Sequence, residues 1–398
     1  MPIRPKARRR ATPALTDACP SVSAARQPEA TAASVTSAAI AACIAFIGVP
    51  AAAWAQSSVQ LYGELDAGVA YVNNVGGHAQ YRLTSGTIDG SYWGLQGSED
   101  LGGGARAIFR LEHGYAVSTG QGINDHPMYV GLGTDALGTV TFGRQYDSIH
   151  DYFAPFTLTG GTGGTAFAHI LDNDNANNSY LAANSVKYTS ATYGGFSFGG
   201  LYAFSNQAGQ FADNRAYSVG ANYTLGSFSA GAAYLHNDGR GQPAGGAYDS
   251  LALPGSAPAT VAAVNLQRQS TFGVGASYEI GDFQLAGTFS RSINTGATDA
   301  DTGDALGSLG LNNYEINGIY KLTPAILLAG MYVYTNGGGA HWHEGALQVD
   351  YLLGKRTDVY IESIYQRASS QAPAIINTND ASGGRNQLML TTGIRHRF

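Results

Sequence analysis

Apolar and polar residues alternate one by one along most of the chain after position 58. In the first stretch, the odd positions from 59 to 71 hold small or apolar residues, and the even positions hold Gln60, Tyr62, Glu64 and Asp66. A period of two places the two rows on opposite faces of a β-strand. In a soluble sandwich the apolar row would face a core, whereas in a membrane barrel it faces lipid and the polar row faces water. Tyr62 and Glu64 would then line the inner face.

The alternation recurs in further segments, and sustained helical periodicity is absent after residue 56. No apolar run in that part reaches the roughly 18 to 20 residues that a membrane helix needs. We predict sixteen strands, near residues 57–71, 90–99, 105–115, 126–134, 139–146, 184–192, 195–204, 215–225, 227–237, 269–280, 283–292, 312–322, 325–335, 341–353, 356–366 and 386–398.

The connections between these strands are alternately short and long. The short ones carry turn residues and are Asp100 to Gly104, Asp135 to Gly138, Tyr193-Gly194, Gly226, Gly281-Asp282, Thr323-Pro324 and Gly354-Lys355. The long ones are rich in Gly, Asn and Asp and include 147–183, 238–268, 293–311 and 367–385. Short turns at one end and long loops at the other are typical of outer-membrane barrels, whose closure leaves no strand edge unpaired. The pattern predicts an all-β fold, a sixteen-stranded antiparallel transmembrane β-barrel over residues 56–398.

Composition agrees with short strands and many turns. Glycine accounts for 54 of 398 residues, and charged residues make up 13%, about half of the roughly 25% found in soluble domains. Several aromatic residues lie where strands meet short turns, namely Tyr193, Phe196, Phe198, Tyr223, Phe228, Tyr278 and Phe283. Their repetition favours an aromatic girdle at one membrane interface.

Residues 1–55 differ from the rest and are predicted to be an export signal that is removed. A basic start precedes an apolar run over 38–53, and Ala53-Trp54-Ala55 has the small-residue pattern of a cleavage site. Cys43 resembles the cysteine of a lipoprotein signal. However, that cysteine should end the apolar region, and here more apolar residues follow it.

Cleavage after residue 55 would remove both cysteines and change the charge. Without Cys19 and Cys43 the mature chain has no disulfide framework and no thiol for catalysis or metal binding. The leader holds six of the 22 basic residues and two of the 28 acidic ones, which leaves 16 against 26 and a formal charge of −10. This acidity argues against a nucleic-acid partner, because phosphate binding needs a basic patch.

Five short motifs are spread over the predicted mature chain. They are SSVQLYG from Ser57, GSEDLGGG from Gly97, VTFGRQYD from Val140, NSVKY from Asn184 and GIRHRF from Gly393. Together they resemble the general porins of Gram-negative bacteria, in particular the betaproteobacterial branch.

The resemblance implies a water-filled channel in the bacterial outer membrane for passive diffusion of small hydrophilic solutes and ions. It also implies a homotrimer of barrels without a cofactor, each barrel narrowed where the third long loop, 147–183, folds inward. The end of the chain, with Ile394 and His396 facing outward and Phe398 last, resembles the signal that the barrel-assembly machinery recognises. We therefore expect that machinery, and the lipid and lipopolysaccharide of the outer membrane, as partners.

Passage through such a channel depends on its radius and on the charges along its wall, not on a catalyst. Strand alternation places Arg106, Arg110, Glu112 and Lys187 on the inner wall, and Arg82, near the first extracellular loop, is a further candidate. In the family such cations face acids on the inward loop. The acids available here are Asp147, Asp151, Asp172 and Asp174, for which the alternative interpretation is solvated loop carboxylates.

The chain departs from the family pattern at three positions. Relatives often have arginine where this chain has Tyr92, arginine or lysine at Gln96, and arginine at Leu181. The wall should therefore be less cationic than in relatives. With a formal mature charge of −10, we expect weak or cation-leaning ion selectivity.

Other chemistry has little support in the sequence. His341 and His343 are two residues apart on one strand without a third ligand nearby in sequence, so we predict no metal site. The glycine runs 160–164 and 337–339 do not lie between a strand and a helix, which argues against nucleotide binding. No Ser/His/Asp constellation suggests an enzyme.

Two non-enzymatic alternatives stay open. A substrate-specific outer-membrane channel would carry an aromatic track or a binding ladder in the lumen, and only Tyr62 and Tyr92 have the required alternation. An adhesin or purely structural barrel would show no single-channel conductance.

Overall fold

The computed structural model describes residues 58–123, 126–238, 250–252, 261–299, 303–370 and 372–398. These residues belong to one compact unit that extends from 53 to 398. The predicted export signal lies outside the described residues. Within them, no helix has the length and apolar character needed to cross a membrane.

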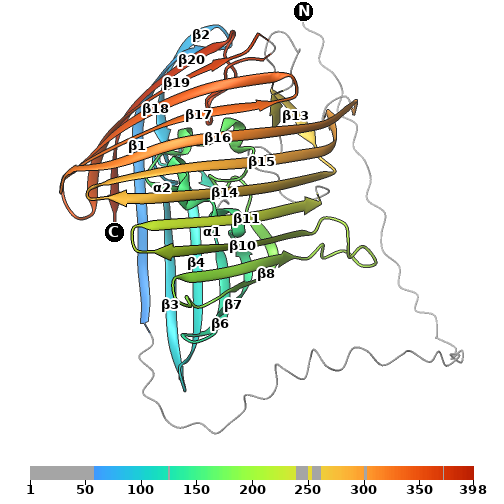
Figure 1. Cartoon of the computed structure of the whole chain (residues 1–398), viewed down its shortest axis with the longest axis vertical. Coiled ribbons are helices and arrows are strands. Elements are labelled where there is room, and N and C mark those ends of the chain that lie inside the picture. The colour runs from blue at the N-terminus through green and yellow to red at the C-terminus, as the bar shows by residue number, and fades with distance from the viewer. Residues whose placement is uncertain (1–57, 124–125, 239–249, 253–260, 300–302, 371) are drawn as a thin grey trace, which may run out of the picture. The chain divides into compact units, whose positions relative to one another are not determined.

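Antiparallel strands follow one another in chain order and form a closed ring (Figure 1). The ring closes because β1 pairs with β20 along one edge and with β3 and β2 along the other. If β2 and β3 are counted as one interrupted strand and the short β5, β12 and β13 are left out, the twenty strands form a ring of sixteen. The strands are β1 (Ser58–Val75), β2 (His78–Ser85), β3 (Tyr92–Gly102), β4 (Ala105–Tyr115), β5 (Gly122–Ile123), β6 (Met128–Thr134), β7 (Gly138–Gln145), β8 (Ala182–Thr189), β9 (Phe196–Ala203), β10 (Ala216–Leu225), β11 (Phe228–Asp238), β12 (Ser250–Ala252), β13 (Val261–Asn265), β14 (Arg268–Ile280), β15 (Phe283–Asp299), β16 (Ala305–Thr323), β17 (Ile326–Gly337), β18 (Ala340–Leu352), β19 (Thr357–Ala368) and β20 (Asn386–Arg397).

The predicted alternation of inner and outer rows is confirmed. On β1, Val59 and Leu61 are 65% and 61% exposed, whereas Glu64 and Asp66 are 4% and 0% exposed. The sixteen-stranded antiparallel barrel is likewise confirmed. A large apolar residue that is exposed on the outside of a closed ring of strands is suited to lipid contact.

Short turns join strands at the predicted end, and two-residue turns also occur at the opposite end, at Gly76-Gly77 and Gly338-Gly339. Ile280 pairs with Phe283, and Gly281 between them has φ +60°. Two-residue hairpins of this kind need a positive φ, which glycine adopts without strain. The neighbouring aromatic residues Phe228 and Tyr278 are cross-strand partners, and both are exposed on the outer row.

The sequence prediction placed some strand ends too early and missed β2. Residues 78–85 form β2, which pairs with the upper half of β1, and the break at 86–91 is held by Asp66. Its Oδ2 accepts hydrogen bonds from the backbone N–H groups of Ile88 and Asp89 at 2.7 and 3.2 Å. β15 and β16 extend beyond the predicted limits of 292 and 312. The ladder between these two extensions contains register shifts between Asn294 and Ala297 and between Ala297 and Thr298. Such irregularities interrupt the period of two on which the prediction depended.

The connection between β7 and β8, here called the inner loop (residues 146–181), lies on the inner face of the strands. It contains α1 (Ser148–Tyr152), η2 (Ala154–Phe156), α2 (Leu158–Gly161), η3 (Thr165–Phe167) and η4 (Ile170–Asp172). Figure 1 shows α1 and α2 within the ring of strands.

Three apolar clusters attach the inner loop to different parts of the wall, and in one of them Ile170 of η4 packs with residues of β16, β18 and β19. Around α1, Ile149, Tyr152 and Phe153 pack against β9, β10 and β11. Around α2 and η3, Leu158 and Phe167 pack with residues of β1, β16, β17, β19 and β20. Full burial of one such side chain stabilises by about 1.5–3 kcal/mol. The loop therefore crosses the interior between these sets of strands.

Glycines on the inner row make room for the aromatic residues of the loop. A Cβ atom at Gly273 of β14 would lie 2.5 Å from Phe153 Cγ, and one at Gly220 of β10 would lie 2.5 Å from the Tyr152 ring. These distances are too short for real contacts. Glycine in a strand interior commonly marks such a close approach.

Candidate channel constriction

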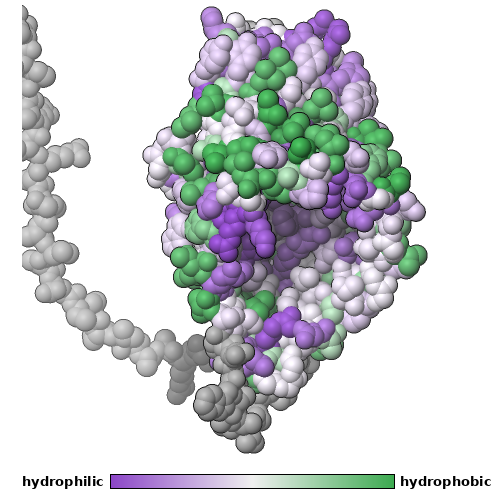
Figure 2. Space-filling model, turned by 90° about the vertical axis from the view of Figure 1, so that its left-hand side faces the viewer, coloured by the Kyte–Doolittle hydropathy of each residue, from purple (hydrophilic) through white to green (hydrophobic). Residues whose placement is uncertain are grey.

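A cavity of about 800 Å³ lies between the inner loop and the wall formed by β3, β4, β6, β7 and β8. Apart from tyrosines, its acidic and basic lining residues are Asp89, Arg110, Glu112, His126, His150, Asp151, Lys187 and Arg395. Figure 2 shows a hollow lined by hydrophilic residues on one side of the molecule. With neutral histidines, the three acids and three permanent cations of the cavity balance.

Lys187 of β8 and Asp151 of α1 join the wall to the inner loop. Lys187 Nζ lies 2.5 Å from Asp151 Oδ2 and donates to the Tyr146 carbonyl at 2.9 Å. Although burial raises the pKa of Asp151, the hydrogen bond from His150 and the charge of Lys187 lower it below its ordinary value. The structure thus brings together one cation and one acid of the sequence-based set.

Arg110 and Glu112 form a second charged pair on β4, next to aromatic rings. Arg110 Nε donates to Glu112 Oε1 at 2.7 Å, and the Tyr62 hydroxyl donates to the same oxygen at 2.5 Å. His126 Nδ1 lies 3.3 Å from Glu112 Oε2. The Tyr92 ring is 4.7 Å from the His126 ring and 6.0 Å from the Tyr62 ring. The cluster combines ionic and aromatic groups on one side of the cavity.

Four of the other candidates do not line this cavity. Arg106 pairs with Asp135 in the short turn after β6. Gln96 donates to Gln60 at 3.2 Å. Arg82 donates to the Thr378 carbonyl at 3.0 Å and to Asn379 Oδ1 at 2.8 Å, so it holds the loop between β19 and β20.

Glu64 is the fourth candidate that does not line the cavity. It belongs to a cluster around Arg395 and Arg397 of β20. Glu64 Oε2 accepts from Arg397 Nε at 3.1 Å, and Arg395 Nε donates to Asp358 Oδ2 at 3.0 Å. Sequence reasoning missed these arginines. The alternation along β20 could have indicated them. Ile394, His396 and Phe398 lie on the exposed outer row, so Arg395 and Arg397 between them belong to the inner row.

Three of the four loop acids are at most 1% exposed and organise the loop itself. Asp147 caps α1 by accepting from the Ile149 N–H at 2.6 Å. Asp172 accepts from the N–H groups of Asn177 and Ser179 at 2.9 and 3.0 Å. Asp174 accepts from His169. None of the three lines the cavity.

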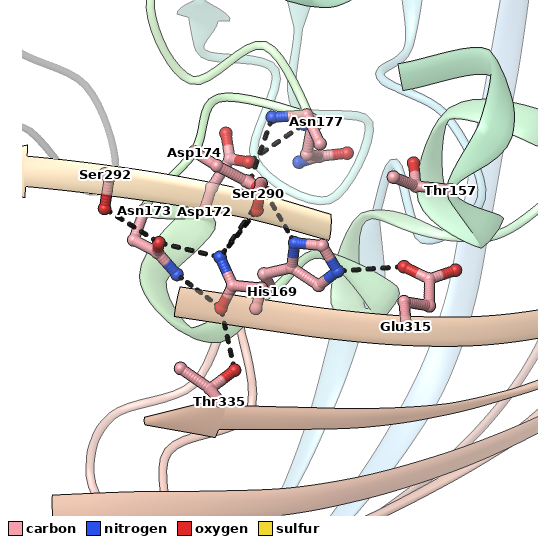
Figure 3. A network of polar contacts seen from close by, with 12 residues as sticks. Thr157, His169, Asp172, Asn173, Asp174, Asn177, Ser290, Ser292, Glu315 and Thr335 are labelled. Atoms are coloured by element: carbon pink, nitrogen blue, oxygen red, sulfur yellow. Dashed lines mark hydrogen bonds and ion pairs between the residues drawn. The ribbon is translucent and has the colours of Figure 1, made fainter. Parts of the chain in front are cut away.

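His169 lies between two carboxylates, one on the loop and one on the wall (Figure 3). Its Nδ1 donates to Asp174 Oδ2 at 2.6 Å, and its Nε2 donates to Glu315 Oε2 of β16 at 2.9 Å. All three side chains are 0% exposed. We call His169, Asp174 and Glu315 the loop clasp.

Uncharged polar groups surround the loop clasp. The amide of Asn313 donates to Asn173 Oδ1 at 2.9 Å, and Ser292 donates to the same oxygen at 3.0 Å. Glu315 Oε1 accepts from the Leu158 N–H at 2.7 Å. Sequence reasoning missed both His169 and Glu315. Glu315 could have been predicted to face the channel, because it lies on the inner row between the exposed Tyr314 and Ile316. No comparable pattern marks His169.

The charges within the loop clasp shift two pKa values in opposite directions. Burial alone would lower the pKa of His169, but the charge of Asp174 and the hydrogen bonds to both carboxylates raise it well above its ordinary value. Burial would raise the pKa of Asp174, but His169 lowers it. Both shifts favour an imidazolium between carboxylates.

Among the described residues, no group of three or more His, Cys, Asp or Glu side chains could hold a metal ion. His341 and His343 of β18 are on the exposed row, with ring centroids 5.6 Å apart. The loop clasp is occupied by its own hydrogen bonds.

Comparison with known proteins gives consistent matches. A family model described as Gram-negative porin matches residues 36–371. The chain is 28% identical over 403 residues to an outer membrane porin protein of Bordetella pertussis. The match covers 88% of this chain and 97% of that protein. It is 28% identical over 256 residues to outer membrane porin protein 32 of Delftia acidovorans. This match covers 63% of this chain and 68% of that protein. An anion-selective porin from Comamonas acidovorans has the same fold, with TM-score 0.69, 23% identity, and coverage of 86% and 100%.

Proposed function

This chain belongs to the Gram-negative porin family and forms an outer-membrane channel for passive diffusion of small hydrophilic solutes, and on this premise we propose that the inner loop sets its narrowest part. Its relatives are channels, so the protein is a channel and not an enzyme. The observation that carries the proposal is the contact between Lys187 on the wall and Asp151 on the loop, inside the 800 Å³ cavity.

The charges at this constriction support weak ion selectivity that leans toward cations. The three acids and three permanent cations that line the cavity balance, while the predicted mature chain carries −10. Tyr92 lines the cavity at a position where relatives often carry arginine. Leu181 is 5% exposed and Gln96 lies away from the cavity, so Tyr92 is the substitution that bears on selectivity.

Reversal potentials of the refolded protein in planar bilayers under a salt gradient test this proposal. We expect a small preference for K⁺ over Cl⁻ in the wild type. Lys187→Gln should increase it, because Asp151 loses its neutralising partner. Arg356→Gln removes one exposed charge from the short turn after β18 and is the matched control. A clear anion preference of the wild type, or equal shifts in both variants, would contradict the proposal.

A substrate-specific channel is the alternative function, and the aromatic rings of Tyr62, Tyr92 and His126 favour it. They lie next to one another, and two of the three line the cavity. A specific channel would show conductance that is blocked in a saturable way by one solute class. A general channel would show conductance proportional to salt concentration without such a block.

We further propose a homotrimer, insertion by the barrel-assembly machinery, and contact with lipopolysaccharide. The exposed outer row at the end of the chain, with Ile394 at 49% and Phe398 at 39% exposure, supports the assembly signal. Deletion of Phe398 should reduce the amount of barrel in the outer membrane. Electrophoresis of unheated protein, which keeps porin trimers intact, should show a species three times the protomer mass.

A further inference from the structure

A pocket of about 510 Å³ opens on the outside of the barrel at the ends of β18 and β19. Its lining contains His341, His343, Arg367 and Arg385, together with Ala368, Ser369 and Ser370. The two histidines and two arginines are exposed. No Asp or Glu of the described chain lines the pocket.

The ends of three strands bring these side chains together. His343 and Arg367 are cross-strand partners of β18 and β19, and such partners have Cβ atoms about 4.5–5.5 Å apart. The Ala368 N–H donates to the Arg385 carbonyl at 2.8 Å, which places the start of β20 beside them. The His341 N–H donates to Ser369 Oγ at 3.1 Å.

The pocket faces away from the channel. Trp342 and Glu344 alternate with the two histidines on β18 and are 2% and 4% exposed on the inner row. The pocket is also at the extracellular end, because β18 starts there and runs toward the short turn that joins it to β19. Its charges therefore meet the outer leaflet rather than the permeating solute.

The arginines of the pocket lack a counter-charge. Within the described residues, neither Arg367 nor Arg385 has a carboxylate within 4.0 Å, whereas Arg395 inside the barrel pairs with Glu64, Asp350 and Asp358. An unpaired arginine on the outer surface is costly at the membrane midplane and tolerated near the interface. The pocket therefore fits the headgroup level.

An apolar surface on β17, β18 and β19 adjoins the pocket. Tyr332 and Tyr365 are each 47% exposed, and beyond them Leu347 and Ile361 are 68% and 55% exposed. Tyrosines between an apolar band and a charged patch are typical of the membrane interface. A ligand seated in the pocket would thus be able to extend acyl chains along the barrel.

We propose that this pocket binds a phosphate group of an outer-leaflet glycolipid, with Arg367 and Arg385 as its principal donors. The proposal rests on the outer-membrane location and the lipopolysaccharide contact given under the proposed function. The guanidinium group binds phosphate oxygens through two parallel hydrogen bonds, and basic side chains at a membrane surface attract anionic headgroups. The adjoining apolar surface selects a lipid phosphate over free phosphate.

Native mass spectrometry of the refolded full barrel in detergent, titrated with bis-phosphorylated lipid A, tests the proposal. We expect the double variant Arg367→Gln/Arg385→Gln to bind lipid A at least about tenfold more weakly than the wild type. The matched control is Lys355→Gln/Arg356→Gln, which removes the same charge from an exposed turn at the opposite end of the barrel. The control should bind as the wild type does.

Additional measurements distinguish a lipid phosphate site from a general charge effect and from a small-anion site. Lipid A without its phosphates should bind weakly to all three proteins. Equal loss in both double variants would indicate a general charge effect, and displacement of lipid A by equimolar inorganic phosphate would indicate a small-anion site; either result overturns the proposal. Conductance of the pocket variant should equal that of the wild type. A wild type that binds lipid A and does not conduct would contradict the channel function alone.

Discussion

His169 Nε2 donates to Glu315 Oε2 across 2.9 Å, and this contact joins the inner loop to β16. The two residues are 146 positions apart in the chain, and both side chains are fully buried. Because Asp174 holds the opposite nitrogen at 2.6 Å, the imidazolium is neutralised from both sides. A buried charge of this kind is stabilising only while each partner is present.

His169→Ala should loosen the inner loop. The substitution leaves Asp174 and Glu315 buried without a counter-charge, and breaking a buried pair in this way costs about 3–5 kcal/mol. We expect noisier single-channel currents with a larger mean conductance, and faster cleavage of the loop by added protease. His78→Ala removes an exposed histidine from the start of β2 and should leave both quantities unchanged. Quiet, wild-type currents from His169→Ala would show that the apolar clusters alone hold the loop.

The loop clasp should also make the channel sensitive to alkaline pH. The pKa of His169 is raised in the folded protein, so its contribution is complete below its ordinary value of about 6.5 and is lost as pH rises through the raised value. The pKa of Asp174 is lowered, so its contribution is complete above its ordinary value of about 3.9 and is lost as pH falls through the lowered value.

Deprotonation of Asp172 at alkaline pH should destabilise the inner loop, as deprotonation of His169 does. Burial and the nearby Asp174 raise its pKa to about 7, so ionisation above that pH adds a buried negative charge to the loop. We expect conductance to become larger and noisier as the pH rises above about 7. The His169→Ala variant should show a smaller alkaline change. An alkaline response of equal size in that variant would locate its cause outside the loop clasp.

The alternation of residues predicted the barrel well because lipid and water impose opposite demands on the two faces of every strand. Val59 outside and Glu64 inside follow directly from a period of two. The same rule placed Arg110 and Lys187 at the cavity. The rule also holds for β2, where Tyr81 and Leu83 are 76% and 58% exposed and alternate with Gln80 and Arg82. This strand was missed although its alternation is present in the sequence.

The inner loop could not be predicted in the same way, because its acids follow no period. Asp147, Asp151 and Asp174 were equivalent in the sequence. In the structure only Asp151 lines the cavity, while Asp147 caps a helix and Asp174 contacts His169. The partner of His169 on the wall is set by the path of the loop across the ring, a long-range property that local patterns do not contain.

Gly273→Ala should shift α1 without changing any charge. Its new Cβ atom would lie 2.5 Å from Phe153 Cγ, and overpacking of this kind typically costs about 1–3 kcal/mol. We expect a changed unitary conductance and a lower midpoint of thermal unfolding. Gly287→Ala on the outer row of β15 is the control, because its Cβ would be 3.8 Å from the nearest atom, the Glu315 carbonyl oxygen. Identical behaviour of the two variants would contradict close packing of Phe153 against β14.

Tyr92→Arg should move the ion preference toward anions. The new side chain would enter the cavity beside Glu112 and His126, where Arg110 already neutralises the carboxylate, so the lining gains one net positive charge. Gln96→Arg adds the same charge on the same strand but away from the cavity, and it is the matched control. Reversal potentials measured across a tenfold salt gradient should shift for Tyr92→Arg and much less for Gln96→Arg. At low ionic strength the difference between the two variants should shrink, because the Debye length then exceeds its value of roughly 10 Å at 0.1 M and the remote charge at position 96 is screened less. Equal shifts from the two variants would mean that total lumen charge, rather than charge at the cavity, sets selectivity.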